Sequence, residues 1–185
     1  AGASINSMSV NFNINHTWVS DLRINLRAPN GNILNLVNAR GGSGDNFVNT
    51  TISSASTTSL ATGAAPFTGT WAADASLGQG PTGFVSNVSN WAALWTGVVS
   101  GNYTLAIRDQ VGGDVGTLTS WSITINYTVN PTATWTGPAG TIFSDPAATV
   151  PYVAGTQANT VYVLPTATST YTANSIVGGA CAGQT

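Results

Sequence analysis

The feature that most constrains the fold is a strict alternation of apolar and polar residues in several short segments. Residues 10–15 read VNFNIN and residues 22–27 read LRINLR, so the apolar side chains occupy every second position. Residues 103–107 and 121–127 repeat the pattern as YTLAI and WSITINY. In a β-strand, successive side chains point to opposite faces. We therefore predict a half-buried strand in each of these segments.

Turn-forming clusters separate the alternating segments. They read PNGN at 29–32, RGGSGDN at 40–46 and QVGGDVG at 110–116. Glycine, proline, asparagine and aspartate favour turns because they adopt unusual backbone angles or bond the local backbone. Short strands with glycine-rich turns, and no sustained helical period, predict an all-β fold. We expect an antiparallel, jelly-roll-like β-sandwich over residues 1–129.

The texture of the sequence changes near Val129. Five of the eight prolines lie at or beyond position 131, and short strand-like segments follow at 161–163 and 170–173. The stretch LPTATSTYTA resembles the closing hairpin of small immunoglobulin-like modules in bacterial surface proteins. We predict such a β module over residues 130–185, either minimal or incomplete, because a full immunoglobulin-type sandwich needs about 100 residues.

The charge of the chain limits its partners. Only 5% of residues are charged, lysine and glutamate are absent, and the formal net charge is −2. Four scattered arginines provide no basic stripe, so we expect no nucleic-acid partner. The longest apolar runs, such as WAALW at 91–95, are too short to insert into a membrane. Cys181, the single cysteine, has no partner for an intrachain disulfide.

Catalysis would have to use His16, the only histidine in the sequence. A hydrolase of the serine type needs a base held by a carboxylate and close to an activated nucleophile. The segment GGSGD around Ser43 does not fit the nucleophile motif G-x-S-x-G, since Asp45 replaces the last glycine. The spacing of His16 and Asp21 suggests a pair across a turn, which we interpret as structural. We predict that the chain is not an enzyme.

Asp109 and Asp114 flank a glycine pair in one predicted loop. Carboxylate and backbone oxygens are the ligands that Ca²⁺ prefers, so these two residues form a candidate calcium site. Turn chemistry is the simpler interpretation, since aspartate bonds the local backbone in such loops. No other cofactor is expected.

Tryptophans offer a second kind of candidate site. Trp121 alternates in phase with Ile123 and Ile125, so we expect it in the core. Trp91 and Trp95 lie in a segment without clear alternation and are candidates for a sugar-stacking surface. The alternative is that they cover one end of the sandwich.

The order of motifs resembles the P domain, or Homo B domain, of subtilisin-like proprotein convertases. The motifs are HTWVSDLRINLRAPNGN, NARGGSGDNFVNT, APFTGTW and SGNYTLAIRDQVGGDVGTLTSWSITI, and they cover residues 4–128 in order. The resemblance implies a β-sandwich that accompanies a catalytic domain. It also implies that His16, Asp21, Arg40 and Trp121 belong to a structural motif.

Together these features favour a non-catalytic structural or adhesive segment of a secreted or cell-surface bacterial protein. Natural edge strands use charged side chains, lysine above all, to block pairing with other chains, and this sequence has no lysine. We therefore expect a multimeric or fibrous assembly, with contacts to other copies or neighbouring domains through residues 131–185. The alternatives are a C-terminal stabilising domain of a subtilisin-like protease and a carbohydrate-binding module with a polysaccharide partner.

Overall fold

The computed structural model of the chain describes residues 3–96, 100–129 and 132–175. The chain divides into two compact units, one over Ile5–Tyr127 and one that joins the first residues, up to Ser4, with the residues from Thr128 on. Each unit is described by itself below. The predicted all-β class is confirmed, since strands form both units and the one α-helix in the described residues has a single turn. Cys181 lies outside the described residues.

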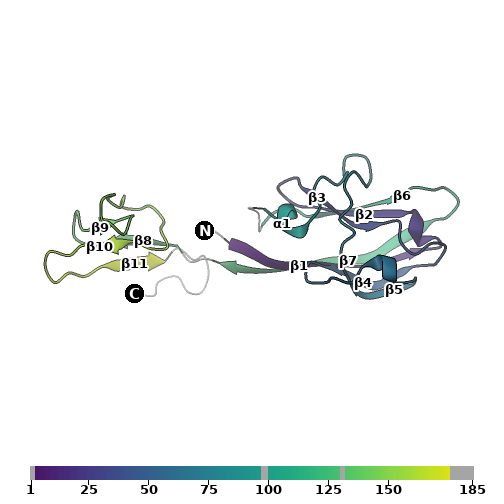
Figure 1. Cartoon of the computed structure of the whole chain (residues 1–185), viewed down its shortest axis with the longest axis horizontal. Helices are drawn as coiled ribbons and strands as arrows, with labels where there is room; N and C mark the ends of the chain where they lie inside the picture. Colours follow the sequence, from purple (N-terminus) through teal and green to yellow (C-terminus); the bar gives the residue numbers. More distant parts are fainter. Residues whose placement is uncertain (1–2, 97–99, 130–131, 176–185) are drawn as a thin grey trace. The chain divides into compact units, whose positions relative to one another are not determined.

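The first unit contains two sheets that stack as layers (Figure 1). The four-stranded sheet has the order β5-β4-β1-β7, and the three-stranded sheet has the order β3-β2-β6. The strands of the four-stranded sheet are β1 (Ala3–His16), β4 (Phe47–Ser53), β5 (Phe67–Trp71) and β7 (Gly116–Val129). Those of the three-stranded sheet are β2 (Leu22–Arg27), β3 (Ile33–Asn38) and β6 (Thr104–Asp109).

The strand pairs follow the antiparallel prediction with one exception. β1 pairs antiparallel with β4, and β2 pairs antiparallel with both β3 and β6. β4 and β5 are parallel, with Thr51 opposite Thr70. Between them the chain returns to the same end of the sheet through a connection that contains the short 3-10 helix η2 (Leu60–Thr62). A parallel pair requires such a return, whereas a tight hairpin would make an antiparallel one.

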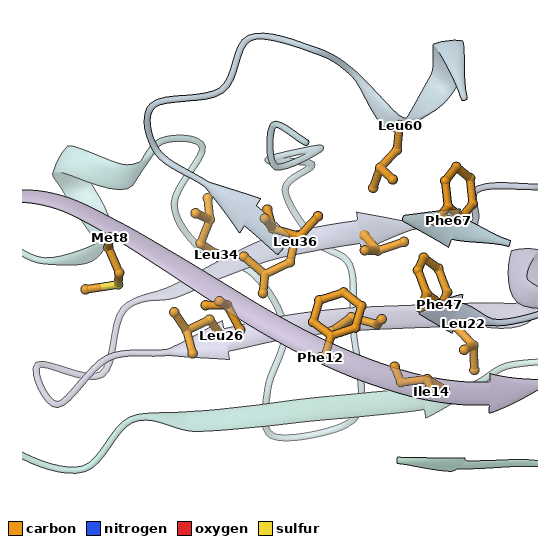
Figure 2. Packing of buried hydrophobic residues seen from close by; sticks show 14 of the residues in the cluster. Met8, Phe12, Ile14, Leu22, Leu26, Leu34, Leu36, Phe47, Leu60 and Phe67 are labelled. Atoms are coloured by element: carbon orange, nitrogen blue, oxygen red, sulfur yellow. The ribbon is translucent and has the colours of Figure 1, made fainter. Parts of the chain in front are cut away.

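The core lies between the two sheets and is built from the apolar side of each alternation. Figure 2 shows the inward side chains of β1, among them Met8, Phe12 and Ile14, against those of the opposite strands. Phe47 stacks on Phe67 with ring centroids 5.2 Å apart and meets Phe12 edge-on at 5.6 Å. Burial of each such side chain contributes about 1.5–3 kcal/mol, so these residues stabilise the contact between the sheets.

Trp121 is not in the core, which corrects the prediction. Its neighbours in phase, Ile123 and Ile125, pack against the core, but Trp121 is 37% exposed. β7 is the edge strand of the four-stranded sheet, and the opposite sheet has only three strands. Part of the inward row of β7 therefore has no strand above it.

In the part of the second unit that the structure describes, four short strands form two-stranded sheets. β8 (Ala133–Thr136) pairs with β11 (Thr172–Ser175), and β9 (Ile142–Phe143) pairs with β10 (Tyr162–Val163). The strands predicted near 161–163 and 170–173 are therefore present. The immunoglobulin-like character of this unit stays a prediction.

Candidate functional site

The corner between β1 and β2 holds His16 and Asp21, and Asp109 and Asp114 contact it. β1 ends at His16, and the 3-10 helix η1 (Val19–Asp21) leads directly into β2. The loop after Arg40 supports this corner, since the Val19 N–H donates to the Gly44 carbonyl at 2.9 Å. Gly41 has a φ of +96°, and a Cβ there would lie 2.6 Å from Phe67 and Val19. The glycine-rich loop therefore packs directly against the corner.

His16 is buried, with 3% of its surface exposed, and both ring nitrogens have partners. The Nδ1 atom accepts a hydrogen bond from the Trp18 N–H at 3.0 Å. An acceptor nitrogen carries no proton, so we assign the Nε2–H tautomer, which donates to Asp109 Oδ2 at 3.2 Å. The imidazole therefore has no free nitrogen to take a proton from a nucleophile. It ties the end of β1 to the end of β6.

The partner of His16 corrects the prediction of a pair with Asp21. Asp21 is 7% exposed and is held in the corner through its backbone. Its N–H donates to the Trp18 carbonyl at 3.1 Å, and its carbonyl accepts from the Gln110 N–H at 3.0 Å. Asp21 thus connects the corner to the loop after β6, next to the residue that binds His16.

Asp109 and Asp114, the candidate calcium ligands, each contact the corner. Asp109 Oδ2 binds His16, and Asp109 Oδ1 accepts from the Val111 N–H at 3.2 Å. Asp114 Oδ1 accepts from the Thr17 hydroxyl at 2.6 Å. Within residues 3–96, 100–129 and 132–175, no three His, Cys or Asp side chains form a cluster suited to a metal ion. Calcium binding at this loop stays a prediction.

Arg40 forms an ion pair with a residue that the sequence did not connect to it. Arg40 Nη2 lies 2.8 Å from Asp74 Oδ1, and the side chain of Asp74 is 3% exposed. Asp74 Oδ2 also accepts from the Asn38 N–H at 2.7 Å. The hydrogen bond to Asp74 raises the pKa of Arg40 above its ordinary value. The pair therefore fixes the end of β3 to the segment after β5.

A hollow of about 430 Å³ opens beside the corner, between the edge strands β6 and β7. Its walls are mostly apolar, with the His16 and Asp109 pair among the lining residues. The lining residues are Ile14, His16, Leu22, Ile107, Asp109, Val115, Gly116, Thr117 and Leu118. Because both ring nitrogens of His16 are bonded to Trp18 and Asp109, the histidine of this hollow is not poised to act as a base.

Trp91 and Trp95 lie in and beside the single-turn helix α1 (Trp91–Leu94), with ring centroids 6.1 Å apart. Both are partly buried and pack against the core. Asn30 Nδ2 holds the helix by donating to the Leu94 carbonyl at 3.0 Å. This arrangement favours the interpretation that the two rings cover one end of the sandwich. Their role in sugar binding stays a prediction.

Comparison with known proteins decides the family. The model of the proprotein convertase P-domain matches residues 5–75 and 72–125. The chain belongs to the P-domain family. A relative, leupeptin-inactivating enzyme 1 of Streptomyces exfoliatus, is 31% identical over 115 residues, which are 62% of this chain and 17% of that protein. This chain therefore matches about a sixth of its relative. No solved structure matches the chain.

The family assignment confirms the predicted P domain and the prediction of a non-catalytic domain. The geometry agrees, because His16 and Asp109 act as structural links. Among the residues that the structure describes, no helix has the length and apolar character to cross a membrane.

Proposed function

We propose that this P domain and its second unit form a structural or adhesive segment of a secreted or cell-surface bacterial protein. The segment works in a multimeric or fibrous assembly, with contacts through residues 131–185. The observation that carries the assembly proposal is the distribution of apolar side chains in the second unit.

Few apolar side chains of the second unit are buried, and several are exposed. Ile142 is its one buried apolar side chain among the described residues, and it is still 9% exposed. Val153 is 66% exposed and Leu164 is 60% exposed, together with Val150, Tyr162 and Val163. In the described residues its sheets have two strands each, and the outer edges of β8 and β9 are bonded to Ala158 and to residues 150–152. The outer edges of β10 and β11, next to which no further strand pairs among the described residues, are the ones open to another chain. Such edges and apolar side chains favour strand addition by another chain.

The assembly proposal is tested by light scattering and electron microscopy of the full chain. Val153→Asp and Leu164→Asp place a charge on the exposed apolar residues without removing core packing. We expect the chain to form particles much larger than a monomer and both variants to shift it toward the monomer. Val111→Asp, at another exposed valine in the first unit, is the matched control. A wild-type chain that stays monomeric at high concentration would contradict the proposal.

A second candidate function is a C-terminal stabilising domain of a subtilisin-like protease. The match to the proprotein convertase P-domain model, and to a small part of a longer enzyme, favours it. Mass spectrometry of the parent protein from its source separates the two functions. An upstream domain with an Asp, His and Ser triad would favour the protease, and an array of further β modules would favour the structural segment.

A further inference from the structure

The outer face of the four-stranded sheet carries a continuous array of small polar side chains, here called the polar face. Its members alternate along their strands with residues of the core, and all are half-buried or exposed. They are Ser7, Ser9, Asn11 and Asn13 of β1, Asn49, Thr51 and Ser53 of β4, Thr70 of β5, and Ser120, Ser122, Thr124 and Asn126 of β7.

The polar face carries no formal charge. β4, β5 and β7 contain no charged residue, and the histidine at the end of β1 is buried on the core side. Three of the four arginines, in contrast, lie in strands of the three-stranded sheet. The side chains of the polar face are hydroxyls and amides, which both donate and accept hydrogen bonds.

Hydrogen bonds between neighbouring strands hold these side chains in place. Asn11 Nδ2 donates to Asn49 Oδ1 and to Thr51 Oγ1, both at 2.9 Å. Asn13 Nδ2 donates to Ser120 Oγ at 3.0 Å. At the other end of the same two strands, Asn126 Nδ2 donates to Ser7 Oγ at 2.9 Å. The array is therefore preorganised, which lowers the entropy lost when a ligand binds.

The rows of the polar face run across the strands. Asn11 pairs with Thr51, and Thr51 pairs with Thr70, so one row crosses three strands. The hydrogen bonds of Ser120 and Asn126 to β1 bracket Ser122 and Thr124, which extends the array to β7. Along a strand the members repeat every second residue, about 6.8 Å, and adjacent strands lie about 4.8 Å apart. A ligand with regularly repeated hydroxyl groups fits such a lattice.

The chemistry of the polar face excludes other classes of partner. Nucleic acid requires cationic side chains, which the face lacks. A stable protein interface needs about 800 Å² per partner with aromatic or arginine anchors, whereas this array of uniformly small side chains measures about 20 by 14 Å. A linear polymer needs no such compact area, because it continues beyond the face.

From these observations we infer that the polar face binds an extended, uncharged, hydroxyl-rich polymer, a neutral polysaccharide. The inference names the partner of the proposed adhesive function and rests on it. Single hydroxyl contacts contribute little, because each replaces a hydrogen bond to water. Several copies in one assembly would bind one polymer with much higher avidity than a single copy.

The test is affinity electrophoresis of the full chain in native gels that contain hydroxyethyl cellulose, a mannan or a xylan. Carboxymethyl cellulose is the anionic comparison. Ser122→Asp and Thr70→Asp each place one negative charge on the polar face at an exposed position. Thr104→Asp places the same charge on an exposed threonine of β6 and is the matched control. Melting temperatures establish that each variant is folded.

We expect retardation of the wild-type chain in at least one neutral gel. Ser122→Asp and Thr70→Asp should weaken that binding about tenfold or more, while Thr104→Asp should bind like the wild type. The absence of retardation in all three neutral gels would overturn the inference, and so would equal binding by Ser122→Asp. Self-association without polymer is measured separately by light scattering. A monomer that still binds the polymer would contradict the assembly proposal alone.

Discussion

Both sheets of the P domain carry asparagines that alternate with core residues, but these side chains are only half-buried in one sheet and fully buried in the other. Asn11 lies on the outer face of the four-stranded sheet, half-buried in the polar face. Asn25 and Asn35 also alternate with core residues but lie on the outer side of the three-stranded sheet, where both are fully buried. The difference is the connection from β5 to α1, residues 72–90, here called the covering segment, which passes over the three-stranded sheet (Figure 1).

Asn25 shows how the covering segment is attached. Its Nδ2 atom donates to the Gln79 carbonyl at 2.6 Å and to the Phe84 carbonyl at 2.7 Å. Asn35 Nδ2 in turn donates to Asn25 Oδ1 at 2.8 Å. A Cβ at Gly80 would lie 2.0 Å from the Asn25 amide nitrogen, so only glycine permits this approach. The asparagines of the three-stranded sheet therefore anchor the covering segment, whereas the side chains of the polar face remain accessible to a ligand.

The largest expected effect is at Asn25. In Asn25→Ala, the Gln79 and Phe84 carbonyls lose their donor, and Asn35 loses an acceptor. Buried groups without partners cost about 1–3 kcal/mol each, so we expect the free energy of unfolding to fall by about 2–4 kcal/mol. Urea denaturation measures the change. A loss below about 0.5 kcal/mol, which is typical of exposed sites, would show that Asn25 does not anchor the covering segment.

The Arg40 and Asp74 pair should have the next largest effect, since it holds the covering segment to the end of β3. Arg40→Ala leaves the buried Asp74 carboxylate with the Asn38 N–H. Because the Arg40 side chain is 34% exposed, water screens part of the interaction, and we expect a loss of about 1–3 kcal/mol. Asp74→Asn in the Arg40→Ala background should recover part of it by removing the unpaired charge. Additive losses in the double variant would contradict the pairing.

Asn11 is the matched position on the polar face and should matter much less. Asn11→Ala removes hydrogen bonds to Asn49 and Thr51 that water can replace. We expect a change in the free energy of unfolding within about 1 kcal/mol, measured by the same denaturation. If Asn11→Ala costs as much as Asn25→Ala, the contrast between a bare and a covered sheet is wrong.

The smallest effect concerns an exposed polar network in the second unit. Asp145 accepts hydrogen bonds from the Val150 and Thr149 backbone and from the Thr149 hydroxyl. The hydrogen bond from the Val150 N–H is the main cause that lowers the pKa of Asp145 below its ordinary value. The carboxylate therefore stabilises its loop above the unfolded-state pKa, and this contribution is lost as pH falls through the folded pKa. NMR titration should show the lowered pKa in the wild type and its return to the ordinary range in a Thr149→Val and Val150→Pro variant.

Alternation in the sequence predicts β1, β2, β6 and β7 and the core residues of β1 and β2, but it does not predict β3, β4 or β5. β1 buries Val10, Phe12 and Ile14 as the period of two requires. The partner of His16 could not be found this way, since it depends on the register that places Leu22 opposite Asp109. That register brings together residues from β1 and β6 that are 93 positions apart.

The sequence pattern does not predict the exposure of Trp121 or the accessibility of the polar face, for a related reason. A strand pattern identifies which side chains leave the core, but what covers them depends on loops and on the number of strands in each sheet. Asn11 and Asn25 have similar sequence surroundings, SVNFN against RINLR. Gly80 permits the close approach of the backbone to Asn25, but the sequence does not show that Asn25 lies beneath it.

The most direct test of the contrast between the two sheets uses the asparagine side chains themselves as probes. The full chain, labelled with ¹⁵N, is titrated with a soluble neutral oligosaccharide of the type that retards it in gels, and the side-chain amide signals are followed by NMR. We expect the Asn11 and Asn13 signals to shift while those of Asn25 and Asn35 stay in place. Shifts confined to the indole signals of Trp91 and Trp95, with the Asn11 and Asn13 signals unmoved, would contradict this expectation.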